Sequence, residues 1–152
     1  RYFTGQPLYP FGHGLSYSRF EYARLAVPKK AAVGAPVPVS VEVRNAGAVA
    51  ADEVVQLYVT DVEASGEAPL RALKGFQRVS LRPGEKRVVR FSLDDRALSL
   101  VGKDGRRAVE PGRFTIGVGG KQPGLSGTAD AATTMVLTAD LELTGAPKPV
   151  AP

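Results

Sequence analysis

The side chains that could do chemistry in this chain are few, and its carboxylates come first. Acid–base hydrolysis needs two carboxyl groups that face one cleft. The adjacent acidic pairs are Asp52-Glu53 and Asp94-Asp95. Successive side chains on a strand point to opposite faces, so Asp52 and Glu53 are predicted to diverge. Asp94 lies where it would cap one helical turn over 94–97. We therefore expect no catalytic residue in this chain.

Other reactive groups are equally sparse. His13 is the single histidine, and the chain has no cysteine. These residues cannot assemble a histidine or cysteine metal site, so no metal and no cofactor is expected. Gly12-His13-Gly14 predicts an imidazole at a packed junction, where it donates to a backbone carbonyl; contact with a substrate is the alternative.

The stretch around His13 is unusually rich in aromatic residues. Seven of the chain's 11 aromatic residues lie in the first 22 positions. Pro and Gly interrupt any regular period there, so residues 1–19, the leading segment, are predicted to be irregular yet in need of burial. We expect this segment to dock within the protein, while ring stacking on a sugar is the alternative. The predicted docking residues are Tyr9, Pro10, Phe11, His13, Leu15 and Tyr17.

Length and charge limit the remaining possibilities. A chain of 152 residues is long enough for one domain with its own core. The net charge is +5, but the basic residues are dispersed and no aromatic residues alternate with them, so nucleic acid is not an expected partner. No apolar run approaches the length of a membrane span, and no membrane association is expected. The chain begins with Arg1, which suggests a fragment of a longer polypeptide. We expect a periplasmic or secreted protein, with the cytoplasm as an alternative.

Alternating apolar residues predict a series of short strands. The clearest lies at 37–43, where valines alternate with polar residues. Further strands are expected at 21–27, 54–60, 70–81, 86–93, 98–101, 106–109, 113–118 and 135–143. Gly75 suggests a bulge or a close approach. Arg82-Pro83-Gly84-Glu85 suits a type II turn, and Lys103-Asp104-Gly105 suits a hairpin.

Many short strands with frequent turn signals and no long helix predict an all-β fold. The predicted architecture is an antiparallel immunoglobulin-like or fibronectin type III-like β-sandwich over residues 20–144. The leading segment would precede it as an interdomain linker. Residues 145–152 contain three prolines and are expected to form a disordered tail.

Several motifs resemble the C-terminal end of a glycoside hydrolase family 3 enzyme. The likeness covers positions 2 to about 120, and its most specific part is the run from Tyr2 to Tyr17. The domain's internal markers are similar to Leu73-Lys74-Gly75-Phe76-Gln77-Arg78-Val79, Leu81-Arg82-Pro83-Gly84-Glu85 and Val109-Glu110-Pro111-Gly112-Arg113-Phe114.

This resemblance implies a fibronectin type III-like sandwich in an exo-acting, retaining enzyme. The partners would be the catalytic domains of the same polypeptide, and the parent's substrate would be a β-linked xylo- or gluco-oligosaccharide. No catalytic residue of the family maps onto this sequence. The motifs at 2–9 and 118–124 are closer to the xylosidase-like branch, so the resemblance favours a β-xylosidase over a β-glucosidase and suggests xylan degradation.

Three functions remain open on the sequence. The first is a non-catalytic domain that stabilises and orients absent catalytic domains. The second is a carbohydrate-binding β-sandwich module, for which Tyr58 is the candidate exposed ring outside the leading segment. The third is a structural or adhesive sandwich unrelated to hydrolysis, against which the motifs argue.

Overall fold

The computed structural model describes residues 9, 11, 18–66, 68–124 and 135–151. Four of the predicted docking residues, Pro10, His13, Leu15 and Tyr17, lie outside them. The elements, in chain order, are β1 (Phe20–Ala26), β2 (Lys30–Ala32), β3 (Val37–Asn45), β4 (Ala51–Asp61), β5 (Ala72–Leu81), β6 (Lys86–Leu93), α1 (Asp95–Leu98), β7 (Leu100–Val101), β8 (Arg107–Val109), β9 (Gly112–Gly119), β10 (Val136–Thr144) and β11 (Lys148–Pro149).

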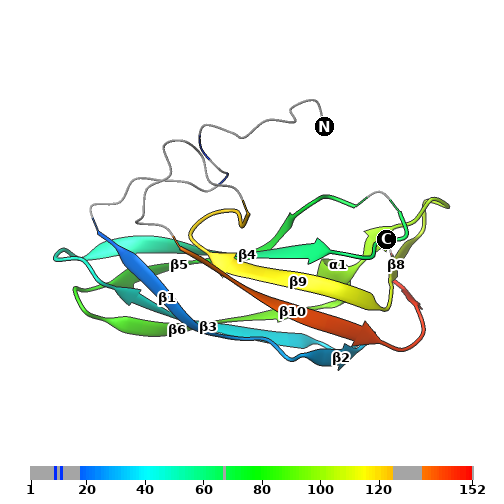
Figure 1. Ribbon diagram of the computed structural model, residues 1–152, viewed down its shortest axis with the longest axis horizontal. Helices are drawn as coiled ribbons and strands as arrows, with labels where there is room; N and C mark the ends of the chain where they lie inside the picture. Colours follow the sequence, from blue (N-terminus) through cyan, green and yellow to red (C-terminus); the bar gives the residue numbers. More distant parts are fainter. Residues whose placement is uncertain (1–8, 10, 12–17, 67, 125–134, 152) are drawn as a thin grey trace.

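Two sheets stack to form a β-sandwich (Figure 1). One sheet has the order β1-β3-β6, and the other has the order β2-β10-β9-β4-β5. The all-β immunoglobulin-like or fibronectin type III-like prediction is confirmed. One pair departs from an antiparallel arrangement, because β2 lies parallel to β10. Strand β2 was not predicted, because it is three residues long and shows no alternation of polarity.

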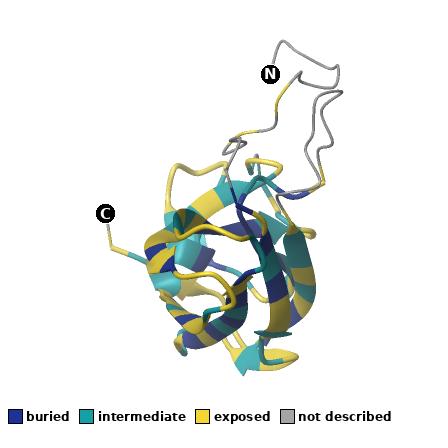
Figure 2. Cartoon of the chain, turned by 90° about the vertical axis from the view of Figure 1, so that its left-hand side faces the viewer, coloured by how far each residue is buried: buried dark blue, intermediate teal, exposed yellow. Residues whose placement is uncertain are grey.

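The core lies between the two sheets, where the inward positions are apolar. Val37, Val39, Val41 and Val43 of β3 are at most 1% exposed, as their alternation predicts. They face buried residues of the other sheet, which include Val55, Leu57, Phe114, Ile116 and Leu141. Buried residues line the inside of both layers in Figure 2. Val55 and Leu57 thus place one face of β4 on the core side.

The turns that connect the strands follow the sequence signals. Glu85 N donates to Arg82 O at 2.9 Å, and Gly84 has a φ of +77°, as a type II turn requires. Gly105 has a φ of +75° in the β7–β8 hairpin. The β4–β5 pairing shifts register between Leu57 and Tyr58, opposite Gly75, which confirms the predicted bulge.

A third, small sheet with the order β11-β8-β7 lies at one end of the sandwich. It overturns the prediction that residues 145–152 form a disordered tail. Lys148 pairs with Val109 and Pro149 with Ala108, and Val150 N donates to Arg107 O at 2.9 Å. The prolines do not prevent this, because Pro149 lies in a two-residue edge strand, a position that tolerates proline.

Candidate functional site

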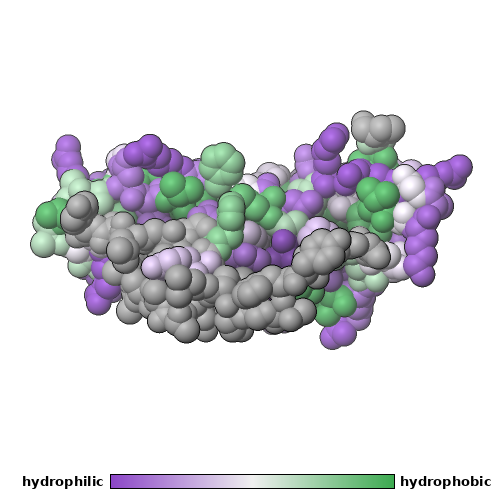
Figure 3. Space-filling view, turned by 90° about the horizontal axis from the view of Figure 1, so that it is seen from above, coloured by the Kyte–Doolittle hydropathy of each residue, from purple (hydrophilic) through white to green (hydrophobic). Residues whose placement is uncertain are grey.

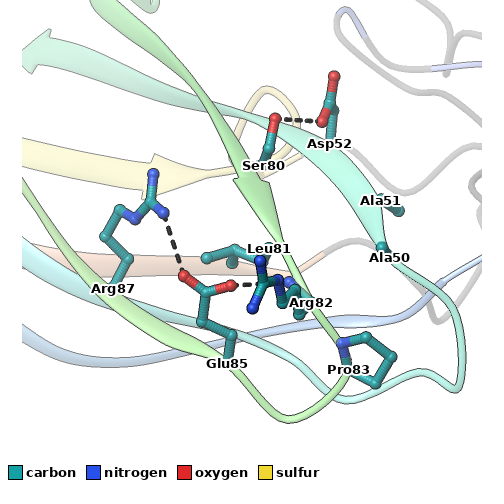
Figure 4. Close-up of a pocket in the computed structure, with 9 residues that line it drawn as sticks. All are labelled: Ala50, Ala51, Asp52, Ser80, Leu81, Arg82, Pro83, Glu85 and Arg87. Carbon is teal, nitrogen blue, oxygen red and sulfur yellow. Dashed lines mark hydrogen bonds and ion pairs between the residues drawn. The ribbon is translucent and has the colours of Figure 1, made fainter.

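The carboxylates at one end of the sandwich line a hollow of about 690 Å³ (Figure 4). Asp52 accepts hydrogen bonds from Ser80 Oγ and from Arg78 Nε, and these hold its pKa below the ordinary value. Glu85 accepts from Arg82 N at 2.8 Å and from Arg87 at 3.1 Å, with the same effect on its pKa. Both groups are therefore ionised and partnered at neutral pH, which suits structural ion pairs and not a general acid.

The other predicted carboxylates are also held apart. Asp94 caps α1 by accepting from Ala97 N at 2.8 Å, as expected, and Asp95 pairs with Lys148. Glu53 diverges from Asp52, as predicted, and accepts from Tyr22 Oη at 2.8 Å. Burial raises the pKa of Glu53, but its side chain lies between the two sheets and not in a hollow that could hold a substrate.

Two predicted docking residues of the leading segment can be placed. Tyr9 is 54% exposed and Phe11 is 65% exposed. Phe11 O accepts a hydrogen bond of 2.9 Å from Gln122 N, in the segment that follows β9. This bond places the backbone of Phe11 beside the segment that follows β9, while the side chain of Phe11 stays largely in solvent.

The segment after β9 folds back over the outer face of the five-stranded sheet. A Cβ atom at Gly117 would lie 2.9 Å from Pro123 Cγ, so the proline ring rests directly on the backbone of β9. Only glycine leaves room for this contact. Pro123 is itself buried. The contact fixes Gln122 in the position from which its backbone amide reaches Phe11.

A buried polar network supports the same segment. Tyr58 Oη donates to Gln56 Oε1 at 2.6 Å, and Gln56 Nε2 donates to Gly120 O at 3.0 Å. Tyr58 is 2% exposed and Gln56 is 6% exposed. The prediction that Tyr58 presents an exposed ring is therefore wrong. Its strand lies inside the sheet, between β9 and β5, and its hydroxyl is used within the domain, so a carbohydrate-binding module loses this candidate contact.

The leading segment enters the sandwich at a second polar cluster. Ser18 Oγ donates to Asn45 Oδ1, which also accepts from Gly47 N at 2.9 Å. Asn45 Nδ2 donates to Val49 O at 2.8 Å and to Leu81 O at 2.9 Å. Asn45 is fully buried. This anchor cluster, Ser18, Asn45 and Gly47, fixes the point at which the leading segment leaves the domain.

Asn45, Gln56 and Gln122 were not predicted from the sequence as supporting residues. The available signal was that Gln56 and Tyr58 share one face of an inner strand, a place where buried polar groups need partners.

The described residues contain no cluster of three or more His, Cys, Asp or Glu that could hold a metal ion. No helix within this part of the chain is long and apolar enough to cross a membrane.

Comparison with known proteins gives the family. The model of the fibronectin type III-like domain matches residues 53–122. "Thermostable beta-glucosidase B" of Acetivibrio thermocellus is 48% identical over 118 residues, which cover 75% of this chain and 15% of that protein. A "Beta-xylosidase" of Formosa agariphila is 44% identical over 139 residues, which cover 91% of this chain and 18% of that protein. "Periplasmic beta-glucosidase" of Salmonella typhimurium is 41% identical over 123 residues, covering 78% and 16%.

Solved structures agree with these relatives. A crystal structure of a β-glucosidase from Listeria innocua in complex with glucose superposes with a TM-score of 0.80 at 33% identity. The match covers 96% of this chain and 20% of that one. The chain thus spans a fifth or less of the length of each of these proteins. By fold, motifs and relatives together, the chain is a fibronectin type III-like domain of the kind found in glycoside hydrolase family 3 β-glucosidases and β-xylosidases.

Proposed function

We propose that this chain is the non-catalytic C-terminal domain of a family 3 glycoside hydrolase, and that it stabilises and orients the catalytic domains of the same polypeptide. The observation that carries the proposal is the leading segment. Its residues Tyr9 and Phe11 are more than half exposed, while its exit is fixed by the anchor cluster around the fully buried Asn45. A segment that leaves the domain at a fixed point and carries exposed aromatic side chains is suited to docking against another domain.

The energetics favour a contact for these rings. Burying an aromatic side chain contributes about 1.5–3 kcal/mol relative to leaving it in water. Tyr9 is 54% exposed and Phe11 is 65% exposed, so burying the remainder of both would contribute about 2–4 kcal/mol, against a domain's total stability of about 5–15 kcal/mol. The predicted docking residues Pro10, His13, Leu15 and Tyr17 complete the proposed contact.

The chemistry would reside in the other domains. The carboxylates at Asp52, Glu85, Asp94 and Asp95 are engaged in hydrogen bonds or ion pairs, and Glu53 is buried against Tyr22. A retaining glycosidase needs two carboxyl groups about 5–5.5 Å apart on either side of the scissile bond. We propose that the parent enzyme is exo-acting and retaining, with both groups outside this chain.

The sugar is proposed as xylose or glucose in a β-linked oligosaccharide. Most of the names among the relatives are β-glucosidases, whereas the relative that matches 91% of the chain is a β-xylosidase. Motifs near both ends of the resemblance favour the xylosidase branch, and with it xylan degradation. We propose a periplasmic or secreted location, which the name of the Salmonella relative supports.

The test compares the isolated chain with the parent enzyme. The isolated chain should not hydrolyse 4-nitrophenyl β-xyloside or β-glucoside, and the parent should hydrolyse at least one. Phe11→Ala should lower the thermal midpoint of the parent and leave that of the isolated chain unchanged. Val101→Ala, at another exposed apolar position, is the control and should change neither. Turnover by the isolated chain, or equal effects of Phe11→Ala in both proteins, would refute the proposal.

A further inference from the structure

The outer faces of the two main sheets differ in chemistry. On the three-stranded sheet, the outward residues pair as ions. Glu21 bonds to Arg19 at 2.8 Å and to Arg44 at 3.7 Å, and Glu42 bonds to Arg24 at 3.2 Å and to Lys86 at 3.4 Å. Exposed ion pairs of this kind are well solvated and contribute little to stability. We expect the outer face of the three-stranded sheet to remain exposed to solvent.

The outer face of the five-stranded sheet also carries ion pairs, such as that of Arg78 with Asp52, but its β5 edge adds large apolar side chains. On β5, Phe76 is 68% exposed and Leu73 is 39% exposed. Leu70, two residues before β5, is 83% exposed, and Val54 on β4 is 42% exposed. Figure 3 views this side of the molecule and shows hydrophobic groups among hydrophilic ones in the described part. These four residues, Leu70, Leu73, Phe76 and Val54, are the β5 patch.

The strand register places the β5 patch beside the buried residues Gln56 and Tyr58 of β4. Phe76 lies directly opposite Gln56, and Leu73 lies directly opposite Tyr58. The Tyr58 hydroxyl donates to Gln56, and the Gln56 amide donates to the Gly120 carbonyl. Two residues further on, Gln122 N donates to Phe11 O. Phe11 and the β5 patch thus belong to one side of the domain, joined by the buried Tyr58–Gln56 network.

We propose that the β5 patch is a second docking surface, which packs against an apolar surface of the catalytic part of the same polypeptide. This inference rests on the proposed function. Two observations select that occupant: the patch continues the face on which Phe11 lies, and the matched relatives are at least five times longer than the region they share with this chain. Exposed apolar patches on a protein surface mark sites where other protein surfaces bind.

The polar groups beside the patch disfavour a sugar as its occupant. The hydroxyl of Tyr58 and the amide of Gln56 already bond to each other and to Gly120, so they are not offered to a hydroxyl-rich ligand. In the described part of the chain, Phe76 is the exposed aromatic ring outside the leading segment. One ring is a poor platform for a sugar chain, whereas aliphatic neighbours such as Leu73 and Val54 suit another protein surface.

The chain has no cysteine, so single cysteines can report the exposure of each face. Phe76→Cys and Val54→Cys mark the β5 patch, and Val88→Cys marks the ion-paired face, where Val88 is 44% exposed. Each variant is labelled with a thiol reagent in the isolated chain and in the parent enzyme, and the labelled peptide is measured by mass spectrometry. Val54→Cys keeps the Phe76 ring, so it reports the contact even if Phe76→Cys loosens it.

We expect all three cysteines to react at similar rates in the isolated chain. In the parent, Val54→Cys and Phe76→Cys should react at least tenfold more slowly, and Val88→Cys should be unchanged. Equal reactivity of Val54→Cys in both proteins overturns the inference. Protection that arises in the isolated chain as its concentration rises also overturns it, because the occupant is then a second copy.

A Phe11→Cys variant separates this inference from the proposed function. Protection of Phe11→Cys in the parent without protection of Val54→Cys leaves the docking of the leading segment intact and refutes the β5 patch alone. Loss of protection at both positions refutes the proposed function as well. Protection of both supports one continuous interface on this side of the domain.

Discussion

Tyr22 and Glu53 join the two sheets through the interior of the sandwich. Tyr22 Oη on β1 donates to Glu53 Oε1 on β4 at 2.8 Å, and Tyr22 is 4% exposed. Burial, and then the nearby Glu53 carboxylate, raise the pKa of the Tyr22 hydroxyl, so it remains a donor. Burial also raises the pKa of Glu53 from its ordinary value of 4.5, and the hydrogen bond from Tyr22 opposes that rise. Burial therefore disfavours the charged form of Glu53 and the hydrogen bond from Tyr22 favours it, so the two effects conflict.

This conflict predicts a dependence of stability on pH. Because the folded pKa of Glu53 is raised, its contribution is fully present below pH 4.5 and is lost as the pH rises through the folded pKa. Glu53→Gln keeps an acceptor for Tyr22 without the charge. In urea unfolding, it should match the original chain near pH 4 and exceed it near pH 8, by about 1 kcal/mol.

Glu85→Gln provides a control of opposite sign. Hydrogen bonds from Arg82 and Arg87 lower the pKa of Glu85, so its contribution is present above pH 4.5 and is lost as the pH falls through the folded pKa. Glu85→Gln should therefore be less stable than the original chain at pH 7 and equal to it at very low pH. Parallel pH profiles for the two variants would contradict both assignments.

Asn45 should be the most sensitive polar residue of the described sandwich. Its side chain donates to Val49 O and Leu81 O and accepts from Ser18 and Gly47, all in a fully buried position. Asn45→Ala removes all four of these hydrogen bonds from a buried position and should lower the free energy of unfolding by about 3 kcal/mol. Ser80→Ala, which removes one exposed bond to Asp52, should cost less than about 0.5 kcal/mol. Chemical denaturation of both variants measures the difference.

Alanine substitutions at Gly47 and Gly84 test a steric clash and backbone strain separately. A Cβ atom at Gly47 would overlap Ser18 Oγ and lie 3.0 Å from Ser18 Cα, so Gly47→Ala must displace the anchor cluster. Gly84 has a φ of +77° with open space around it, so Gly84→Ala adds strain alone. We expect losses of about 2 kcal/mol or more and about 1 kcal/mol, respectively.

Amide hydrogen exchange then locates each effect. Gly47→Ala should increase exchange at Ala46, whose N–H donates to Arg19 O at 2.7 Å, and Gly84→Ala should not. Unchanged protection at Ala46 in Gly47→Ala would show that the anchor cluster does not fix the leading segment.

The parts of the fold that the sequence predicts are those set by local patterns. Alternation of valines determines the inward face of β3, and the Pro83-Gly84 pair determines the turn, because each signal acts over a few residues. The Gly75 bulge also follows from its residue type. These features need no knowledge of distant partners.

Features that depend on distant partners were not predicted. The hydroxyl of Tyr58 can be buried on an inner strand because it donates to Gln56, which in turn donates to Gly120 O, 64 positions along the chain. Strand β2 exists because Thr144 and its neighbours pair with it from the far end of the chain. Of the docking residues, Tyr9 and Phe11 are described as exposed, and the docking itself remains a prediction.

The short strand β11 should contribute to the stability of the domain. β11 pairs with β8, Val150 packs against the core, and Lys148 bonds to Asp95. Removing residues 148–152 uncovers β8 and should lower the free energy of unfolding by about 1–2 kcal/mol, mainly through lost burial of Val150. Removing residues 151–152 alone keeps those contacts and should change stability by less than about 0.5 kcal/mol. Equal stability of the two truncated chains in urea would show that β11 does not contribute to the folded domain.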